Sequence, residues 1–101
     1  MTIYNKLVRD GVPDHIRSMN EPFKSHIADD NEFKEKLYHK LQEESAEFVE
    51  NPGKGELADL LEVVEAVKKL NGWSTEDIES VRLEKLAKKG GFNDRIILEE
   101  S

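Results

Sequence analysis

Hydrophobic and polar residues follow one another along most of this chain with the spacing of amphipathic α-helices. A long helix is predicted up to about Glu50, because one of residues 29–31 can cap its start and a Pro–Gly pair follows its end. Wound at about 100° per residue, this helix gathers its apolar residues in one narrow stripe. The stripe consists of Phe33, Leu37, Leu41 and Phe48.

A second helix is predicted from about Glu56 to Leu70, after a connection that contains Pro52 and two glycines. Because the connection is so short, the two helices should be antiparallel neighbours that form a helical hairpin. The second helix has a broader apolar arc than the first. This arc contains Leu57, Leu60, Leu61, Val63, Val64 and Val67.

Three shorter elements complete the expected fold, which is mostly α-helical. A short helix should begin at Val12–Pro13 and run to about Met19. A third long helix should begin after Ser74, a good N-cap, and end at Gly90–Gly91. The segment 95–98 resembles a terminal strand, and the segment around Ile27 is its only evident partner for a two-stranded β element.

Carboxylates occur on the apolar faces of the predicted hairpin, where an isolated charge is costly. Glu44 lies inside the stripe of the first helix and Glu47 lies at its edge. On the second helix Glu56 falls within the apolar arc and Asp59 at its border, whereas Glu62 points to the solvated side. The four inward carboxylates should therefore converge inside the hairpin.

Such a cluster is tolerable only with protonation, with nearby Lys or Arg side chains, or with bound cations. Few basic residues lie on the facing stripes, so a hard divalent cation is the simplest of these answers. Carboxylates spaced i, i+3 on two facing helices suit Mg²⁺, or Mn²⁺ as a substitute, and open positions on the ion suit a phosphate-bearing substrate. A metal-acidified water would be the nucleophile. Taken singly, an i, i+3 pair of carboxylates is most often only a solvated helix face.

Composition excludes several classes of protein. Charged residues make up 37% of the 101 residues, the formal net charge is −7, and there is no cysteine, which excludes disulfides and zinc sites built on sulfur. The acidic surplus argues against binding to a nucleic-acid polymer or a membrane surface. No apolar run is long enough to span a bilayer, and the first residues lack a signal-peptide core, which predicts a cytoplasmic location.

The segments 43–47 (EESAE) and 56–59 (ELAD) resemble the EExxE…ExxD signature of the all-α nucleotide pyrophosphohydrolases. This superfamily includes MazG, the phosphoribosyl-ATP pyrophosphohydrolases and the dimeric dUTPases. The flanking segments 4–10 (YNKLVRD) and 90–98 (GGFNDRIIL) are similar to those of small MazG-like members. Two features depart from the pattern: the connection between the two motifs is shorter than in many members, and Gly11 stands where relatives often carry a basic residue.

The resemblance implies that residues 1–101 form one MazG-like domain that hydrolyses the α–β phosphoanhydride of a nucleoside triphosphate with Mg²⁺, giving monophosphate and pyrophosphate. It makes Glu44, Glu47, Glu56 and Asp59 the metal ligands. The candidates for positioning the attacking water are Glu44, Glu47 and Glu43, although Glu43 lies further round its helix and is otherwise simply exposed. One alternative is phosphoribosyl-ATP hydrolysis, and another is a non-catalytic helical interaction module.

Basic side chains should help to neutralise a triphosphate. The candidates for binding it are Lys6, Arg9, Arg82, Lys85, Lys89 and Arg95. The three residues on the third long helix would otherwise form a solvated basic stripe. Trp73 and Tyr38 are either platforms for base stacking or, as is more usual, core or interface residues.

A second copy of the chain is the expected partner besides the nucleotide. A hairpin with carboxylates on its apolar face buries little surface alone, so two hairpins should pack as a four-helix bundle in a homodimer or a higher homo-oligomer. Basic residues from both subunits would then approach each site.

Overall fold

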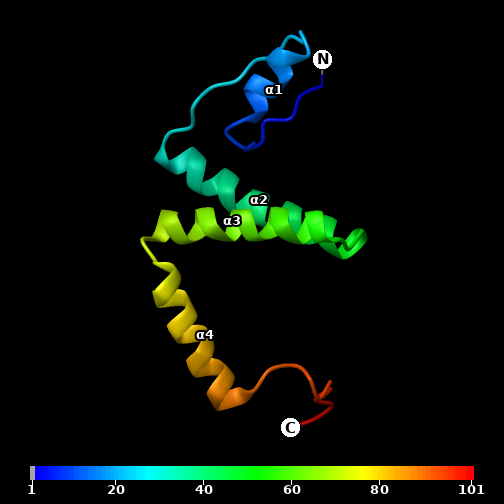
Figure 1. Cartoon of the computed structure of the whole chain (residues 1–101), viewed down its shortest axis with the longest axis vertical. Helices are drawn as coiled ribbons and strands as arrows, with labels where there is room; N and C mark the ends of the chain where they lie inside the picture. Colours follow the sequence, from blue (N-terminus) through cyan, green and yellow to red (C-terminus); the bar gives the residue numbers. More distant parts are fainter. Residues whose placement is uncertain (1) are drawn as a thin grey trace.

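The computed structural model describes residues 2–101, which form four α-helices (Figure 1). Helix α1 spans Val12–Ser18, α2 spans Asp30–Glu50, α3 spans Lys54–Asn71 and α4 spans Thr75–Lys89. The mostly α-helical class and the four predicted helices are thus confirmed, with α3 starting two residues earlier than the sequence predicts. None of these helices is both long and apolar enough to cross a membrane within the described part of the chain.

Local signals set the ends of the long helices. The side chain of Asp29 caps α2 by accepting a hydrogen bond from the backbone N–H of Glu32 at 2.8 Å. Ser74 and Asp77 form a reciprocal capping box at the start of α4, with both hydrogen bonds at 3.0 Å. Gly72 ends α3 with a φ of +71°, in the left-handed region that glycine adopts without a steric penalty.

Helices α2 and α3 pack against each other as an antiparallel hairpin, and within residues 2–101 theirs is the only extensive packing between helices (Figure 1). Residues 51–53 connect them. The buried apolar side chains between them are Leu37, which is 1% exposed, and Val63. At the other end of the hairpin the side-chain amide of Asn71 donates to the hydroxyl of Tyr38 at 3.2 Å. Tyr38 is half-buried, and this hydrogen bond links it to the end of α3.

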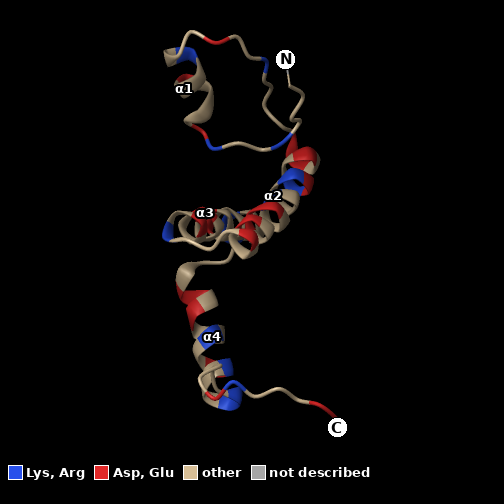
Figure 2. Ribbon diagram, turned by 90° about the vertical axis from the view of Figure 1, so that its right-hand side faces the viewer, with Lys and Arg blue, Asp and Glu red and all other residues tan. Residues whose placement is uncertain are grey.

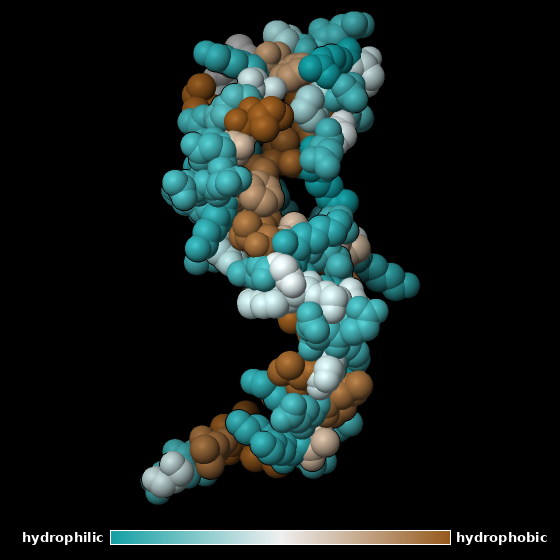
Figure 3. All heavy atoms as spheres, turned by 90° about the vertical axis from the view of Figure 1, so that its left-hand side faces the viewer, coloured by the Kyte–Doolittle hydropathy of each residue, from teal (hydrophilic) through white to brown (hydrophobic). Residues whose placement is uncertain are grey.

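Helix α4 and the C-terminal tail extend away from the hairpin (Figures 1 and 2). No residue of α4 is buried. The chain measures 56 × 31 × 24 Å with a radius of gyration of 17.9 Å, whereas a compact domain of this length has one of about 13 Å. Apolar surface is therefore left open along α4 and the tail, which Figure 3 shows as brown patches. The exposed apolar residues of α4 are Ile78, Val81, Leu83 and Leu86.

The predicted β element is wrong for the described chain, because residues 2–101 contain no strand. Arg95 adopts a φ of +58°, and its backbone N–H bonds to the carbonyl of Phe92 at 3.3 Å, so a turn interrupts the expected strand at its first residue. Ile96 and the proposed partner Ile27 are 80% and 97% exposed. A strand needs a neighbour that satisfies its backbone groups, and neither segment supplies one to the other.

Candidate metal centre

Five carboxylates gather where the C-terminal half of α2 faces the first turns of α3. They form two groups of three residues. In each group every residue offers one carboxylate oxygen, and these three oxygens lie within 4.8 Å of one another. The first group is Glu43, Glu44 and Glu47, and the second is Glu44, Glu56 and Asp59. The tight connection brings these turns together, and Glu44 belongs to both groups. We refer to these five residues as the carboxylate cluster.

Glu44 is the buried centre of the carboxylate cluster. The residue is only 8% exposed, and its Oε1 lies 3.4 Å from the Nζ atom of Lys40. Its Oε2 is buried and has no hydrogen-bond partner within residues 2–101. A buried carboxylate oxygen without a partner is destabilising, and native structures rarely leave one in that state. The atom is therefore in the position expected of a ligand to a cation.

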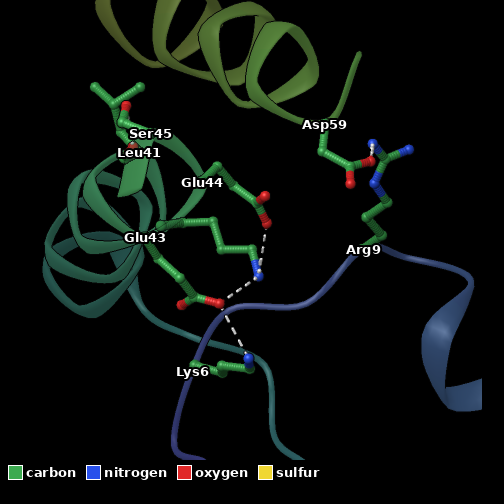
Figure 4. Close-up of polar contacts among 8 residues, drawn as sticks. Lys6, Arg9, Leu41, Glu43, Glu44, Ser45 and Asp59 are labelled. Carbon is green, nitrogen blue, oxygen red and sulfur yellow. Dashed lines mark hydrogen bonds and ion pairs between the residues drawn. The ribbon is translucent and has the colours of Figure 1, made fainter. Parts of the chain in front are cut away.

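Three basic side chains reach the carboxylate cluster, and two of them, Lys6 and Arg9, come from outside the hairpin (Figure 4). Lys6 Nζ lies 3.0 Å from Glu43 Oε1, and a guanidinium nitrogen of Arg9 lies 2.9 Å from Asp59 Oδ1. Lys40 Nζ lies 3.4 Å from oxygens of both Glu43 and Glu44. Part of the negative charge is thus balanced by the chain itself.

These ion pairs change the acidities of the side chains involved. Burial alone would raise the pKa of Glu43, but the hydrogen bond from Lys6 and the charges of Lys40 and Lys6 outweigh it and hold the pKa below its usual value. The same hydrogen bond raises the pKa of Lys6. Both groups therefore stay charged around neutral pH.

Glu47 has the opposite environment. The negative charge of Glu44 is the main cause that raises the pKa of Glu47, with smaller contributions that include partial desolvation and the charges of Glu43 and Glu56. Glu47 and Glu56 form no ion pair with any residue in the part of the chain that the structure describes. Repulsion among the carboxylates is therefore only partly relieved.

The residues present fit a divalent cation. Five carboxylates face three basic side chains, which leaves two negative charges to balance. Oxygen ligands of one Mg²⁺ lie about 3–4.2 Å apart, since each Mg–O bond is about 2.1 Å. Small movements of side chains whose oxygens are already within 4.8 Å would bring three of them to one ion. The Oε2 of Glu44 would then gain a partner, which residues 2–101 do not give it.

The other predicted ligands differ in burial. Glu56 and Asp59 are half-buried, in agreement with their places on the apolar arc of α3, whereas Glu47 is exposed rather than inside the hairpin. Glu47 and Glu56 also line an open hollow of about 230 Å³, together with Glu50 and Asn51. This hollow lies beside the carboxylate cluster at the connected end of the hairpin.

The predicted phosphate-binding residues divide into two sets. The structure brings Lys6 and Arg9 to the carboxylate cluster, but not the four others, which lie on the extended α4 and tail (Figure 2). These four are Arg82, Lys85, Lys89 and Arg95. Arg82 forms an ion pair with Glu79 one turn earlier on α4. Within one copy of the chain, the basic stripe of α4 is therefore a solvated face.

Lys40 is the functional candidate that the sequence analysis missed. It precedes Glu43 and Glu44 by three and four residues, a spacing that places side chains on the same face of a helix. The sequence carries that spacing, which pairs residues along one helix rather than across the two facing stripes. Trp73, by contrast, is half-exposed and lines a separate open hollow of about 490 Å³ with residues of α4.

Comparisons with models of protein families, with curated proteins and with solved structures give no match. The likeness of segments 43–47 and 56–59 to the pyrophosphohydrolase signature therefore stays an expectation. The case for a function rests on the geometry of the carboxylate cluster and on the chemistry of its residues.

Proposed function

We propose that this protein is a Mg²⁺-dependent nucleoside triphosphate pyrophosphohydrolase, with the carboxylate cluster as its metal centre. The observation that carries the proposal is the buried Oε2 of Glu44, which has no hydrogen-bond partner among the described residues and belongs to a side chain shared by both groups of three carboxylates. Oxygen-only sites favour hard cations, and Mg²⁺ commonly takes further ligands from the phosphates of a substrate. The phosphate oxygens of a nucleoside triphosphate would supply such ligands.

Each residue of the site would have a distinct task. Glu44, Glu56 and Asp59 would hold the cation, and Glu47 would join them from the exposed side. A bound Mg²⁺ supplies an acidified water and neutralises phosphate charge. Glu43 keeps a lowered pKa, so it is ionised around neutral pH and able to accept a proton from water. Lys6 and Arg9 would bind the phosphate oxygens.

We propose in addition that the active form is a homodimer. Two observations support a second copy as the partner. Residues 2–101 bury only two apolar side chains, and part of the apolar arc of α3 stays open, with Leu57 44% and Leu61 56% exposed. Pairing two such arcs would give the expected four-helix bundle. It would also allow the basic residues of one copy's α4 to approach the carboxylate cluster of the other.

Pyrophosphate release from a panel of nucleoside triphosphates, with and without Mg²⁺, tests the activity. We expect Mg²⁺-dependent turnover of at least one nucleotide, and a loss of at least about a hundredfold in Glu44→Gln, which keeps the size of the side chain but removes its charge. The matched control is Glu62→Gln, an exposed glutamate of α3 outside the cluster. It should retain wild-type activity.

The absence of turnover for every nucleotide would contradict the enzymatic proposal. If the unfolding temperature also failed to respond to Mg²⁺, the alternative of a non-catalytic helical module would be favoured. The pairing of the cluster with Lys6, Arg9 and Lys40 is the observation that supports this alternative, since it gives the carboxylates a partly structural role.

A further inference from the structure

The N-terminal arm, which we define as residues 2–10, crosses the open side of the hairpin (Figure 4). Lys6 and Arg9 project from it to Glu43 on α2 and to Asp59 on α3. Asn5, directly before Lys6, adopts a φ of +45°, in the left-handed region that Asn enters more readily than most residues. The arm therefore reaches both helices that carry the carboxylate cluster.

Charge is the main attachment of the arm. Among the ion pairs of residues 2–101, only Lys6–Glu43 and Arg9–Asp59 join positions more than six residues apart in the sequence. The apolar side chains near the tip contribute little, since Ile3 is 79% exposed and Tyr4 is 69% exposed. Leu7 alone within the arm is half-buried. Such an attachment is weak and open to competition.

A cation would compete with the arm for the same carboxylates. Asp59, which pairs with Arg9, belongs to one group of possible ligands, and Glu43, which pairs with Lys6, belongs to the other. A cation and a guanidinium placed on one carboxylate repel each other, so the gain from either contact is smaller when the other is present. Asp59 is also half-exposed, so Arg9 has room to move away.

We propose that the arm is a displaceable internal counter-ion, which pairs with the carboxylate cluster when no metal is bound and is released by the metal to bind the phosphates of the substrate. The inference rests on the proposed metal centre. It adds an order of events, because the cation frees Lys6 and Arg9 before the substrate can use them.

Calorimetric titration of Mn²⁺ alone, without nucleotide, tests the competition. In Arg9→Gln the dissociation constant for Mn²⁺ should fall by about two- to fivefold, the range expected for removal of one partly exposed ion pair. In Lys6→Gln the change should be smaller, because Glu43 keeps its contact with Lys40. The matched control is Lys24→Gln, a change of the same charge at an exposed lysine outside the ion pairs of the described chain.

Trypsin cleavage of the wild-type protein tests the release itself. Mn²⁺ should speed the cut after Lys6 several-fold and leave the cut after Lys24, an internal control, unchanged. Two results would overturn this inference and leave the metal centre intact. One is an Mn²⁺ affinity that is the same in Arg9→Gln as in the wild type, and the other is a rate of cleavage after Lys6 that bound Mn²⁺ does not change. Wild-type protein that binds no Mn²⁺ would instead overturn the metal centre, and the inference with it.

Discussion

At the scale of single residues, the decisive feature is one glutamate placed where the helix pattern calls for an apolar side chain. Glu44 is buried and lies near four other carboxylates, and one of its oxygens finds no hydrogen-bond partner in the described part of the chain. The negative charge of Glu44 is the main cause that raises the pKa of the neighbouring Glu47. Repulsion among these carboxylates is what a bound cation would relieve.

Removal of the charge of Glu44 should stabilise the metal-free protein. In Glu44→Gln we expect the unfolding temperature to rise by about 4 °C, because the repulsion falls and Lys40 keeps Glu43 as a partner. The pKa of Glu47 should fall back towards its ordinary value of 4.5, as followed by a carboxyl NMR titration. An unchanged Glu47 titration would show that the two side chains do not interact in solution.

At the scale of elements, helix ends and the hairpin were predictable from local signals. Asp29, Ser74 and Gly72 act at the helix ends as caps of these residue types do generally. The terminal strand was not predictable in the same way, since a strand depends on a partner from elsewhere in the chain. Segment 95–98 has β-branched residues, but Arg95 turns the backbone away from any pairing.

The capping box of α4 gives a pH-dependent contribution to helix stability. Hydrogen bonds from the backbone and side chain of Ser74 lower the pKa of Asp77 below its ordinary value of 3.8. The contribution is therefore complete above about pH 4 and is lost as the pH falls through the lowered pKa of the folded state. An NMR titration of the Asp77 carboxyl should give a midpoint below 3.8, and Ser74→Ala should raise it. Equal midpoints in both proteins would show that the Ser74 hydroxyl does not contribute to the lowered pKa of Asp77.

The contact between α2 and α3 should be sensitive to the loss of Leu37. This side chain is 1% exposed, so Leu37→Ala should lower the free energy of unfolding by about 3 kcal/mol. The matched control is Val49→Ala on the same helix. Val49 is 78% exposed, so its loss should change the free energy of unfolding by less than about 0.5 kcal/mol. Urea unfolding of the three proteins would measure both, and similar losses for the two variants would argue against the hairpin core.

At the scale of the whole molecule, the chain is extended and has little core. Its radius of gyration and the exposed apolar side chains of α3 and α4 indicate that one copy leaves much apolar surface in water. The same arrangement separates the basic residues of α4 from the carboxylate cluster. A second copy would cover this apolar surface and could bring its own basic residues to the carboxylate cluster. We propose the dimer for these two reasons.

Sedimentation equilibrium tests that assembly. The wild-type protein should sediment with twice the mass of one chain, and Leu61→Lys should weaken association at least about tenfold by placing a charge on the open arc of α3. Glu62→Lys, its exposed neighbour on the opposite side, should leave association unchanged. A wild-type monomer at millimolar concentration would contradict the dimer.

The sequence predicted the cluster better than its surroundings. Helical spacing was enough to place Glu44, Glu56 and Asp59 together, because two faces of one hairpin meet across a short connection. The contacts of Lys6 and Arg9 with those carboxylates depend on the path of an irregular arm, for which the sequence has no periodic signal. The remote position of Arg82 and Lys85 reflects the direction of α4, which tertiary packing sets and a single helix pattern does not.

The most direct test of a cation in the carboxylate cluster is the unfolding temperature of wild-type protein and Glu44→Gln as Mg²⁺ or Mn²⁺ is added. At about a hundred times its dissociation constant, a bound ion stabilises the folded state by about 2.7 kcal/mol, which is about 10 °C or more for a chain of this length. We predict that rise in the wild type and its loss in Glu44→Gln. A flat wild-type curve, or an equal rise in both proteins, would contradict the metal centre.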